Sequence, residues 1–210
     1  MKKTTNLKQE LMVFLEKRLT PHEFQRSHQL FYRKTSTGKQ ILHVSIIRRK
    51  SYIDIVPSVE IRHNEIERLY HLLLGELPNL QTATIGCELG NLSGNGTKML
   101  TIRELSDVPI AGEEILKTFW DVGQSFFVKY SSLERIFDVL IRDGKTAKIY
   151  CPLPDVRAKK TLIAAYLLNR KNIYDDLVDK KIIYLNTIDI SYAIDFLQFA
   201  VKLKKLFSSL

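Results

Sequence analysis

The residues best placed for chemistry lie on one predicted strand, where His43 and Ser45 alternate with apolar residues. Ser58 lies across from them on the next predicted strand. A histidine beside a serine hydroxyl is the minimum of a nucleophilic site, because the imidazole takes the proton of the attacking oxygen. A lone histidine on a strand is far more often an ordinary hydrogen-bonded surface residue. An enzyme therefore stays an alternative, and a protein without catalytic activity is the favoured interpretation.

The same predicted sheet face combines aromatic and basic side chains, which suits a binding surface. Aromatic rings stack on bases and cations contact phosphates, so such a face could bind single-stranded nucleic acid. Asp54 and Glu60 oppose this function because their carboxylates repel phosphate. A solvated or helix-covered face of an antiparallel sheet is the simpler explanation. The candidate binding residues are Tyr32, Arg33, His43, Arg48, Arg49, Lys50, Tyr52 and Asp54.

A glycine-rich segment, residues 90–98, offers backbone N–H groups that could hold a phosphate. Its spacing does not match a Walker loop, and it leads into a strand-like segment instead of a helix, so we expect a hairpin loop. The histidines and cysteines lack metal-ligand spacing, although His63 and His71 could lie near one another at the ends of a short helix. We expect no cofactor and no metal, and buried free thiols at Cys87 and Cys151.

The charge balance of the 210-residue chain is basic, with 32 Lys and Arg, 23 Asp and Glu, and a net charge of +9. This excess favours an anionic partner: a nucleic acid, an acidic protein or a phosphate surface. The cations are spread along the chain, so a solvated basic surface without a dedicated site is the simpler explanation. The amino terminus is too polar for a signal peptide, and no apolar run reaches the about 20 residues that span a bilayer. We expect a cytoplasmic protein that does not bind membranes.

The elements that would position these residues follow from hydrophobic periodicity. An amphipathic helix is predicted over residues 6–19, and a strand over residues 29–35. Two alternating segments, residues 42–46 and 53–61, then predict an antiparallel pair. A two-residue turn at Lys50-Ser51 would place the apolar residues of both strands on the same face.

The segments after this hairpin alternate between helix and strand patterns. Pro57 lacks an N–H group, so its strand is expected at a sheet edge or with a bulge. A helix is predicted to start at Asn64, with Glu67 as its capping-box partner, and to end at Gly75. Two further strand-like segments within residues 81–103 are expected to form a hairpin.

From residue 110 onward the pattern is helical. The last predicted helix has a stripe that we expect to face the core, formed by Ile190, Ile194, Leu197 and Val201. Three lysines near its end suit the negative end of the helix dipole. A basic helix could also lie on a membrane, but core packing is the favoured interpretation.

Together these elements predict an α+β fold: an antiparallel sheet of about five strands with helices packed on one face, followed by a helical C-terminal half. Residues 1–104 form the sheet region and residues 105–210 the helical region. No linker rich in Pro, Gly or Ser separates them, so we expect one composite domain.

Two stretches of the chain resemble a bacterial family that is described only as a domain of unknown function. The first covers about 75 residues and includes Leu30-Phe31-Tyr32-Arg33; the second is Phe126-Phe127-Val128-Lys129-Tyr130-Ser131-Ser132-Leu133-Glu134. The resemblance is structural and carries no catalytic residues. It implies at most a binding role, as in small α+β proteins encoded beside bacterial toxin or defence genes.

Three functions follow from these observations. The leading hypothesis is a non-enzymatic binding or immunity-type protein that recognises a macromolecular partner, protein or nucleic acid, through a sheet face or groove. The second is a nucleic-acid-binding protein that uses the basic clusters, with affinity that falls steeply with salt. The third is an enzyme with a site on the polar sheet face, which requires a pocket near His43 or Asp54. The oligomeric state does not follow from the sequence.

Overall fold

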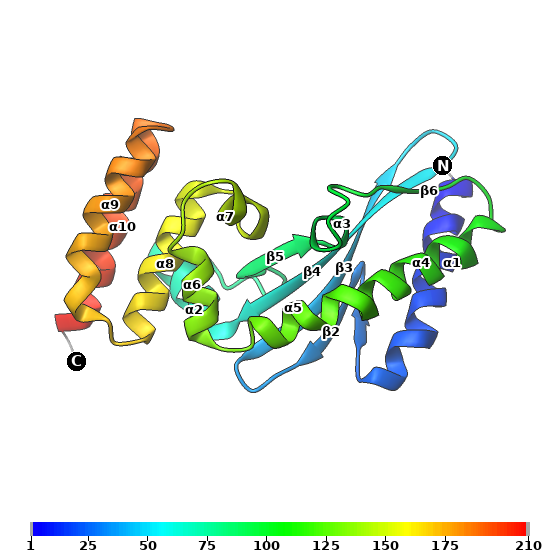
Figure 1. The fold of residues 1–210 in the computed structure, drawn as a ribbon, viewed down its shortest axis with the longest axis horizontal. Coiled ribbons are helices and arrows are strands. Elements are labelled where there is room, and N and C mark those ends of the chain that lie inside the picture. Colours follow the sequence, from blue (N-terminus) through cyan, green and yellow to red (C-terminus); the bar gives the residue numbers. More distant parts are fainter. Residues whose placement is uncertain (1, 209–210) are drawn as a thin grey trace. The chain divides into compact units, whose positions relative to one another are not determined.

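The computed structural model describes residues 2–208, apart from the side chains of residues 2, 3, 145, 146, 207 and 208. Its sheet is built around the predicted hairpin, which is formed by β3 (Gly38–Arg48) and β4 (Ile53–His63) (Figure 1). Arg49 N donates to Tyr52 O at 3.0 Å, which closes the predicted two-residue turn. The alternating apolar side chains of the hairpin are buried, among them Leu42, Val44, Ile53, Ile55 and Val59.

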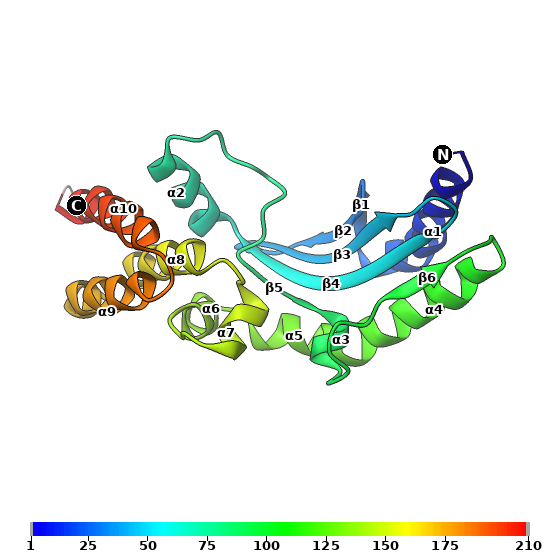
Figure 2. The same ribbon diagram turned by 90° about the horizontal axis from the view of Figure 1, so that it is seen from above.

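The other strands extend this hairpin on both sides. They are β1 (Gln25–Ser27), β2 (Leu30–Lys34), β5 (Ile85–Glu88) and β6 (Leu100–Ile102). The order of the antiparallel sheet is β1-β2-β3-β4-β5, and β6 also pairs with β4 (Figure 2). The predicted α+β class with an antiparallel sheet, helices on one face and a helical C-terminal half is confirmed.

Pro57 does not mark an edge strand, because β4 lies inside the sheet. β6 pairs with Ile53–Ile55, and a Cβ on Gly86 of β5 would lie 3.3 Å from Val59 O. In a strand, the backbone N and C=O groups of residues two apart point toward the same neighbouring strand, so those of Pro57 point to the same side of β4 as those of Val59. Pro57 therefore falls between the stretches of β4 that face β6 and β5, where its missing N–H removes no ladder hydrogen bond.

The expected hairpin between β5 and β6 is also wrong, since both strands pair with β4. A short helix, α3 (Leu89–Leu92), follows β5 directly. The glycine-rich loop then folds back on itself, with Asn95 N donating to Gly90 O at 2.9 Å. Gly94 and Gly96 have positive φ angles of 79° and 68°, which suit glycine. This compact loop separates β5 from β6 and leaves each of them free to pair with β4.

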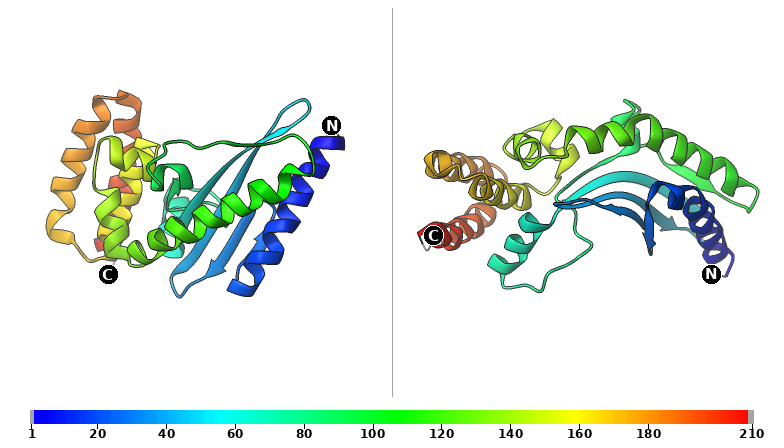
Figure 3. Two further views of the ribbon diagram at one scale, coloured as in Figure 1. Left: turned by 45° about the vertical axis from the view of Figure 1, so that its right-hand side comes forward. Right: turned by 90° about the horizontal axis from the view of Figure 1, so that it is seen from below.

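One compact unit contains most of the sheet and comprises the chain up to Ile61 together with Gly86–Lys129. Figure 3 shows its helices α4 and α5 crossing one face of the sheet, and α1 packs against α4. A Cβ on Gly123 would lie 3.0 Å from Val59 Cγ1, so the helical layer approaches β4 closely at this glycine. The helices of this unit are α1 (Lys2–Leu19), η1 (Thr20–His22), α4 (Asp107–Thr118), the π-helical η2 (Phe119–Gly123) and α5 (Gln124–Lys129).

The second compact unit is helical and comprises Arg62–Ile85 together with the chain from Tyr130 onward. Its central helix is α8, which contacts α2, α6, α9 and α10. Among the described residues, no helix is long and apolar enough to cross a membrane. The helices of this unit are α2 (Asn64–Leu74), α6 (Leu133–Leu140), α7 (Lys145–Tyr150), α8 (Pro154–Leu167), η3 (Lys171–Ile173), α9 (Tyr174–Asn186) and α10 (Ile190–Ser208).

The predicted core face of α10 is wrong. The four residues expected inside, Ile190, Ile194, Leu197 and Val201, are between 47% and 69% exposed. The buried residues of α10 are instead Ala193, Phe196, Phe199, Ala200 and Leu203. This helix has two apolar faces, and the one with the larger aromatic side chains and the small alanines packs into the unit.

Candidate functional site

The candidate site is the loop that joins α2 to β5, residues 76–82, together with the buried polar side chains that hold it. We call this segment the 76–82 loop. Gly75 ends α2 with a φ of 73°, and Glu76 N then donates to His71 O at 2.9 Å. Leu77 is 90% exposed and Leu80 is 68% exposed. Leu72, on the last turn of α2, is also exposed, so three leucines face solvent within nine residues.

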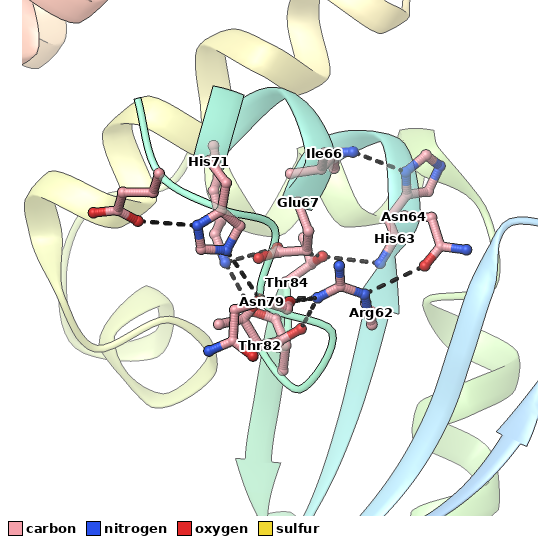
Figure 4. A network of polar contacts seen from close by, with 12 residues as sticks. Arg62, His63, Asn64, Ile66, Glu67, His71, Asn79, Thr82 and Thr84 are labelled. Atoms are coloured by element: carbon pink, nitrogen blue, oxygen red, sulfur yellow. Dashed lines mark hydrogen bonds and ion pairs between the residues drawn. The ribbon is translucent and has the colours of Figure 1, made fainter. Parts of the chain in front are cut away.

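Arg62, at the end of β4, holds the middle of the loop (Figure 4). Its Nη1 donates to Asn79 O at 2.8 Å, to Thr82 O at 2.7 Å and to Thr82 Oγ1 at 2.8 Å. The side chain is buried, and burial lowers the pKa of Arg62 from its ordinary value although Glu67 acts in the opposite direction. A guanidinium stays charged at neutral pH, so these are charge-assisted hydrogen bonds.

Glu67 and Lys160 form a buried ion pair below the end of the loop. Glu67 has no exposed surface, and its Oε1 lies 2.8 Å from Lys160 Nζ and accepts a hydrogen bond from Thr84 Oγ1 at 2.8 Å. Lys160, on α8, also donates to Ala83 O at 2.7 Å. Within the described chain, Glu67 Oε2 is a buried oxygen without a hydrogen-bond partner. The pair therefore fixes the backbone at residues 83–84 and also contains one costly unsatisfied atom.

The two histidines that flank α2 belong to the same network. The backbone N–H of His63 donates to Thr84 Oγ1 at 2.9 Å, and His63 Nδ1 accepts from Ile66 N at 3.4 Å. His63 is therefore the N-cap of α2, and burial lowers its pKa, which favours the neutral imidazole that capping requires. The predicted capping box at Asn64 and Glu67 is wrong, because the Glu67 carboxylate binds Lys160 and Thr84.

His71 ties the start of the loop to its end. Its Nδ1 lies 3.0 Å from Glu76 Oε2, and its Nε2 lies 3.4 Å from Thr82 Oγ1. The Thr82 hydroxyl donates to Asn79 O at 3.0 Å and accepts from Arg62, so it links the Arg62 guanidinium to the loop backbone beside His71. Within the described part of the chain, no group of three or more His, Cys, Asp or Glu side chains could hold a metal ion. The network thus acts as a clamp on the loop backbone.

The predicted nucleophilic group is assembled elsewhere, on the sheet. His43 Nδ1 lies 2.9 Å from Glu60 Oε1, and Ser45 Oγ lies 3.5 Å from His43 Nε2. Ser58 Oγ donates to Glu60 Oε1 at 3.1 Å. The order serine, histidine, carboxylate is that of a catalytic triad, with the carboxylate in position to hold Nδ1–H and leave Nε2 as the base.

The other predicted binding residues near the hairpin turn are engaged with one another. Asp54 is buried and accepts from Arg49 Nε at 2.8 Å and from Thr101 Oγ1 at 2.8 Å. The hydrogen bond from Arg49, followed by that from Thr101, holds the pKa of Asp54 below its usual value. The Arg103 guanidinium lies 4.9 Å from the centroid of the Tyr52 ring. The charge of Asp54 is thus compensated by its partners, and its buried carboxylate is not placed to repel a phosphate.

The remaining candidates are dispersed. Arg48 and Lys50 are exposed at the β3–β4 turn. Lys39 Nζ lies 4.7 Å from the centroid of the Tyr32 ring. Arg33 lies on the helix-covered face instead, where its Nη2 donates to Gln40 Oε1 at 2.7 Å and to Gln124 Oε1 at 3.5 Å. These residues therefore do not form one continuous surface.

Sequence reasoning missed the clamp residues Arg62, Glu67 and Lys160. No local signal pointed to Lys160, because α8 carries Arg157, Lys159, Lys160 and Thr161 close together and all four are buried. No protein-family model matches the chain, and no curated protein and no solved structure matches it either.

Proposed function

We propose that this chain is a non-enzymatic binding protein that recognises a protein partner through the 76–82 loop. One observation carries the proposal: a loop with two highly exposed leucines is fixed from below by buried, charge-assisted hydrogen bonds. Exposed leucines scattered singly are ordinary, but a group of them on a held loop is typical of a contact surface.

The cost of the clamp supports a functional role for the loop. Burying Arg62, Glu67 and Lys160 costs desolvation free energy, and apolar residues would stabilise a core at least as well. Arg62 donates to carbonyl oxygens of the loop, Lys160 donates to the carbonyl oxygen of Ala83 next to it, and Glu67 accepts from the Thr84 hydroxyl. A loop held in one conformation loses less entropy on binding, so the clamp increases affinity by preorganisation.

The chemistry of the loop favours an apolar pocket on a protein over a nucleic acid. Leu77 and Leu80 offer aliphatic surface, and the neighbouring charge is the carboxylate of Glu76, which pairs with His71. A phosphate backbone would require cations at this position. The partner expected here presents a hydrophobic pocket or groove that accepts the leucine side chains.

The test compares the proteins that three versions of the chain capture from cells of the natural host. The loop variant is Leu77→Ser with Leu80→Ser, and the matched control is Leu105→Ser with Ile110→Ser, two exposed apolar residues in the other unit. We expect at least one protein that the wild type and the control capture and the loop variant does not. Identical sets for all three versions would refute the proposal.

A second candidate function, acyl-group hydrolysis, is favoured by the arrangement of Ser45, His43 and Glu60. In that reaction Ser45 Oγ would attack an ester carbonyl and give its proton to His43 Nε2, which would then protonate the leaving alcohol. A water molecule, deprotonated by the same imidazole, would then attack the acyl-serine, release the acid and return the proton to Ser45 Oγ.

An activated ester tests this second function. We expect an acyl adduct on Ser45, detected by mass spectrometry after brief exposure to p-nitrophenyl acetate, and loss of turnover in Ser45→Ala. Ser51→Ala, in the β3–β4 turn, is the control. Turnover that is unchanged in Ser45→Ala but lost in His43→Ala would show a surface imidazole reacting by itself and would exclude the serine mechanism.

A further inference from the structure

We propose that two copies of this chain associate through the exposed apolar face of α10, with the two helices antiparallel and related by a two-fold axis. We call this face the α10 stripe; it consists of Ile190, Ile194, Leu197 and Val201. The proposal concerns a different surface from the 76–82 loop and does not depend on the function proposed for that loop.

The spacing of the stripe is that of a helix–helix seam. Successive members are four, three and four residues apart, the spacing of apolar positions in a coiled coil. At 100° per residue the four positions fall within an arc of about 60°, and at 1.5 Å per residue they extend over about 16 Å. The opposite side of α10 packs into its own unit, where Phe196, Phe199 and Leu203 are buried. The stripe is therefore a second, separate apolar face.

The stripe is symmetric about its own centre, which is the requirement of an isologous two-fold contact. In an antiparallel pair, Ile190 of one copy meets Val201 of the other, and Ile194 meets Leu197. Every side chain of the stripe then contacts another member of the stripe. These side chains are β-branched or γ-branched aliphatic residues, so the seam is free of buried polar groups.

The charges along α10 favour the antiparallel orientation. The acidic residues, Asp189 and Asp195, precede or lie in the first half, and the cations, Lys202, Lys204 and Lys205, lie in the second half. Asp195 is bonded to Lys159, and Lys204 Nζ lies 2.6 Å from Asp175 Oδ1, so both already have partners. In the register that joins Ile190 to Val201, Asp189 of one copy lies beside Lys202 of the other, and this pairing occurs twice by symmetry. A parallel pair would bring like charges together.

The first test is the oligomeric state of the full chain, measured by sedimentation velocity over a micromolar concentration series. We expect a reversible monomer–dimer equilibrium for the wild type. Leu197→Glu places a carboxylate beside the centre of the seam in both copies, and it should raise the dissociation constant by about 100-fold or more. Ile110→Glu, at a comparably exposed helical position in the other unit, should leave the equilibrium unchanged. Far-UV circular dichroism checks that both variants are folded. A wild-type chain that stays monomeric throughout the series refutes the proposal.

The second test fixes the orientation by cross-linking. Cysteine variants Ile190→Cys and Val201→Cys are prepared separately and mixed under mild oxidation. An antiparallel seam should yield the mixed disulfide and little of either symmetric one, because a disulfide needs Cβ atoms about 4 Å apart. Symmetric Ile190→Cys dimers would show a parallel pair and contradict the proposal. Cys87 and Cys151 are buried, so they should not compete.

Discussion

The most specific prediction from the clamp is the loss of stability when Lys160 is replaced by methionine. In the wild type Lys160 Nζ lies 2.8 Å from Glu67 Oε1 and donates to Ala83 O at 2.7 Å, and neither charged side chain is more than 5% exposed. Methionine keeps most of the packing volume but removes the charge. Glu67 would keep its hydrogen bond from Thr84 and lose its counter-charge, while its Oε2 already lacks a partner in the described chain.

The expected loss is large because a charge is left uncompensated in the interior. Removing one partner of a buried ion pair costs about 3–5 kcal/mol, which corresponds to a fall in Tm of about 6–20 °C for a chain of this size. Glu67→Gln keeps an oxygen that can accept from Thr84 and removes the negative charge. The double variant Glu67→Gln/Lys160→Met should therefore lose less stability than the sum of the two single variants, by about 2 kcal/mol or more.

Urea unfolding followed by far-UV circular dichroism measures the four free energies of this cycle. Fluorescence of Trp120 is unsuitable as the main probe, because the single tryptophan belongs to the other compact unit. Hydrogen exchange at residues 79–84 should rise in Lys160→Met before exchange rises in the sheet. A loss below about 1 kcal/mol for Lys160→Met would refute the reasoning, as would additive effects in the double variant.

Three further predictions concern single residues. Arg62→Lys keeps the charge but cannot reproduce the bonds of the guanidinium, so exchange of the loop amides should rise by about 10- to 100-fold. Burial lowers the pKa of His63, so as the pH falls the unfolded chain binds a proton at this residue before the folded chain does. The free energy of unfolding therefore keeps its full value above about pH 6.5 and decreases below it. His63→Asn can still cap α2 and does not titrate, and between pH 7 and pH 5 its urea midpoint should fall less than that of the wild type. Gly123→Ala would crowd Val59 and should cost about 1–3 kcal/mol in urea unfolding; an unchanged midpoint would contradict the close approach.

Local patterns predicted the β3–β4 hairpin well, because strand alternation and turn length are properties of neighbouring residues. The alternating apolar residues of residues 42–61 and the Lys50-Ser51 turn fix which side chains of the hairpin are buried. His43 and Ser45 could be placed on the polar face by the same argument. Their hydrogen bonds to one another and to Glu60 could not be predicted, since they depend on the rotamers of three side chains.

The clamp could not be predicted from the local pattern. Glu67 lies three residues after Asn64, the spacing of a capping box, and an exposed carboxylate near a helix N-terminus is the ordinary expectation. Its actual partner, Lys160, is 93 residues away on α8. Only the packing of α8 against α2 reveals that the two charges are buried together.

The last helix shows the limit of helical periodicity when a helix has two apolar faces. Both faces satisfy the spacing rule, and the rule has no means of choosing between them. The face with Phe196 and Phe199 is buried, because these rings remove more apolar surface from water and the alanines beside them allow close packing.

The most direct test of the proposed function is site-specific photo-cross-linking in cells of the natural host. A benzoylphenylalanine residue replaces Leu77, and the control carries the same probe at Ile110. We predict that irradiation joins the position-77 probe to one protein species, which the position-110 probe does not capture, and that Arg62→Ala weakens this adduct by releasing the loop. The same set of adducts from both positions, or no protein adduct from position 77, would contradict a recognition role for the 76–82 loop.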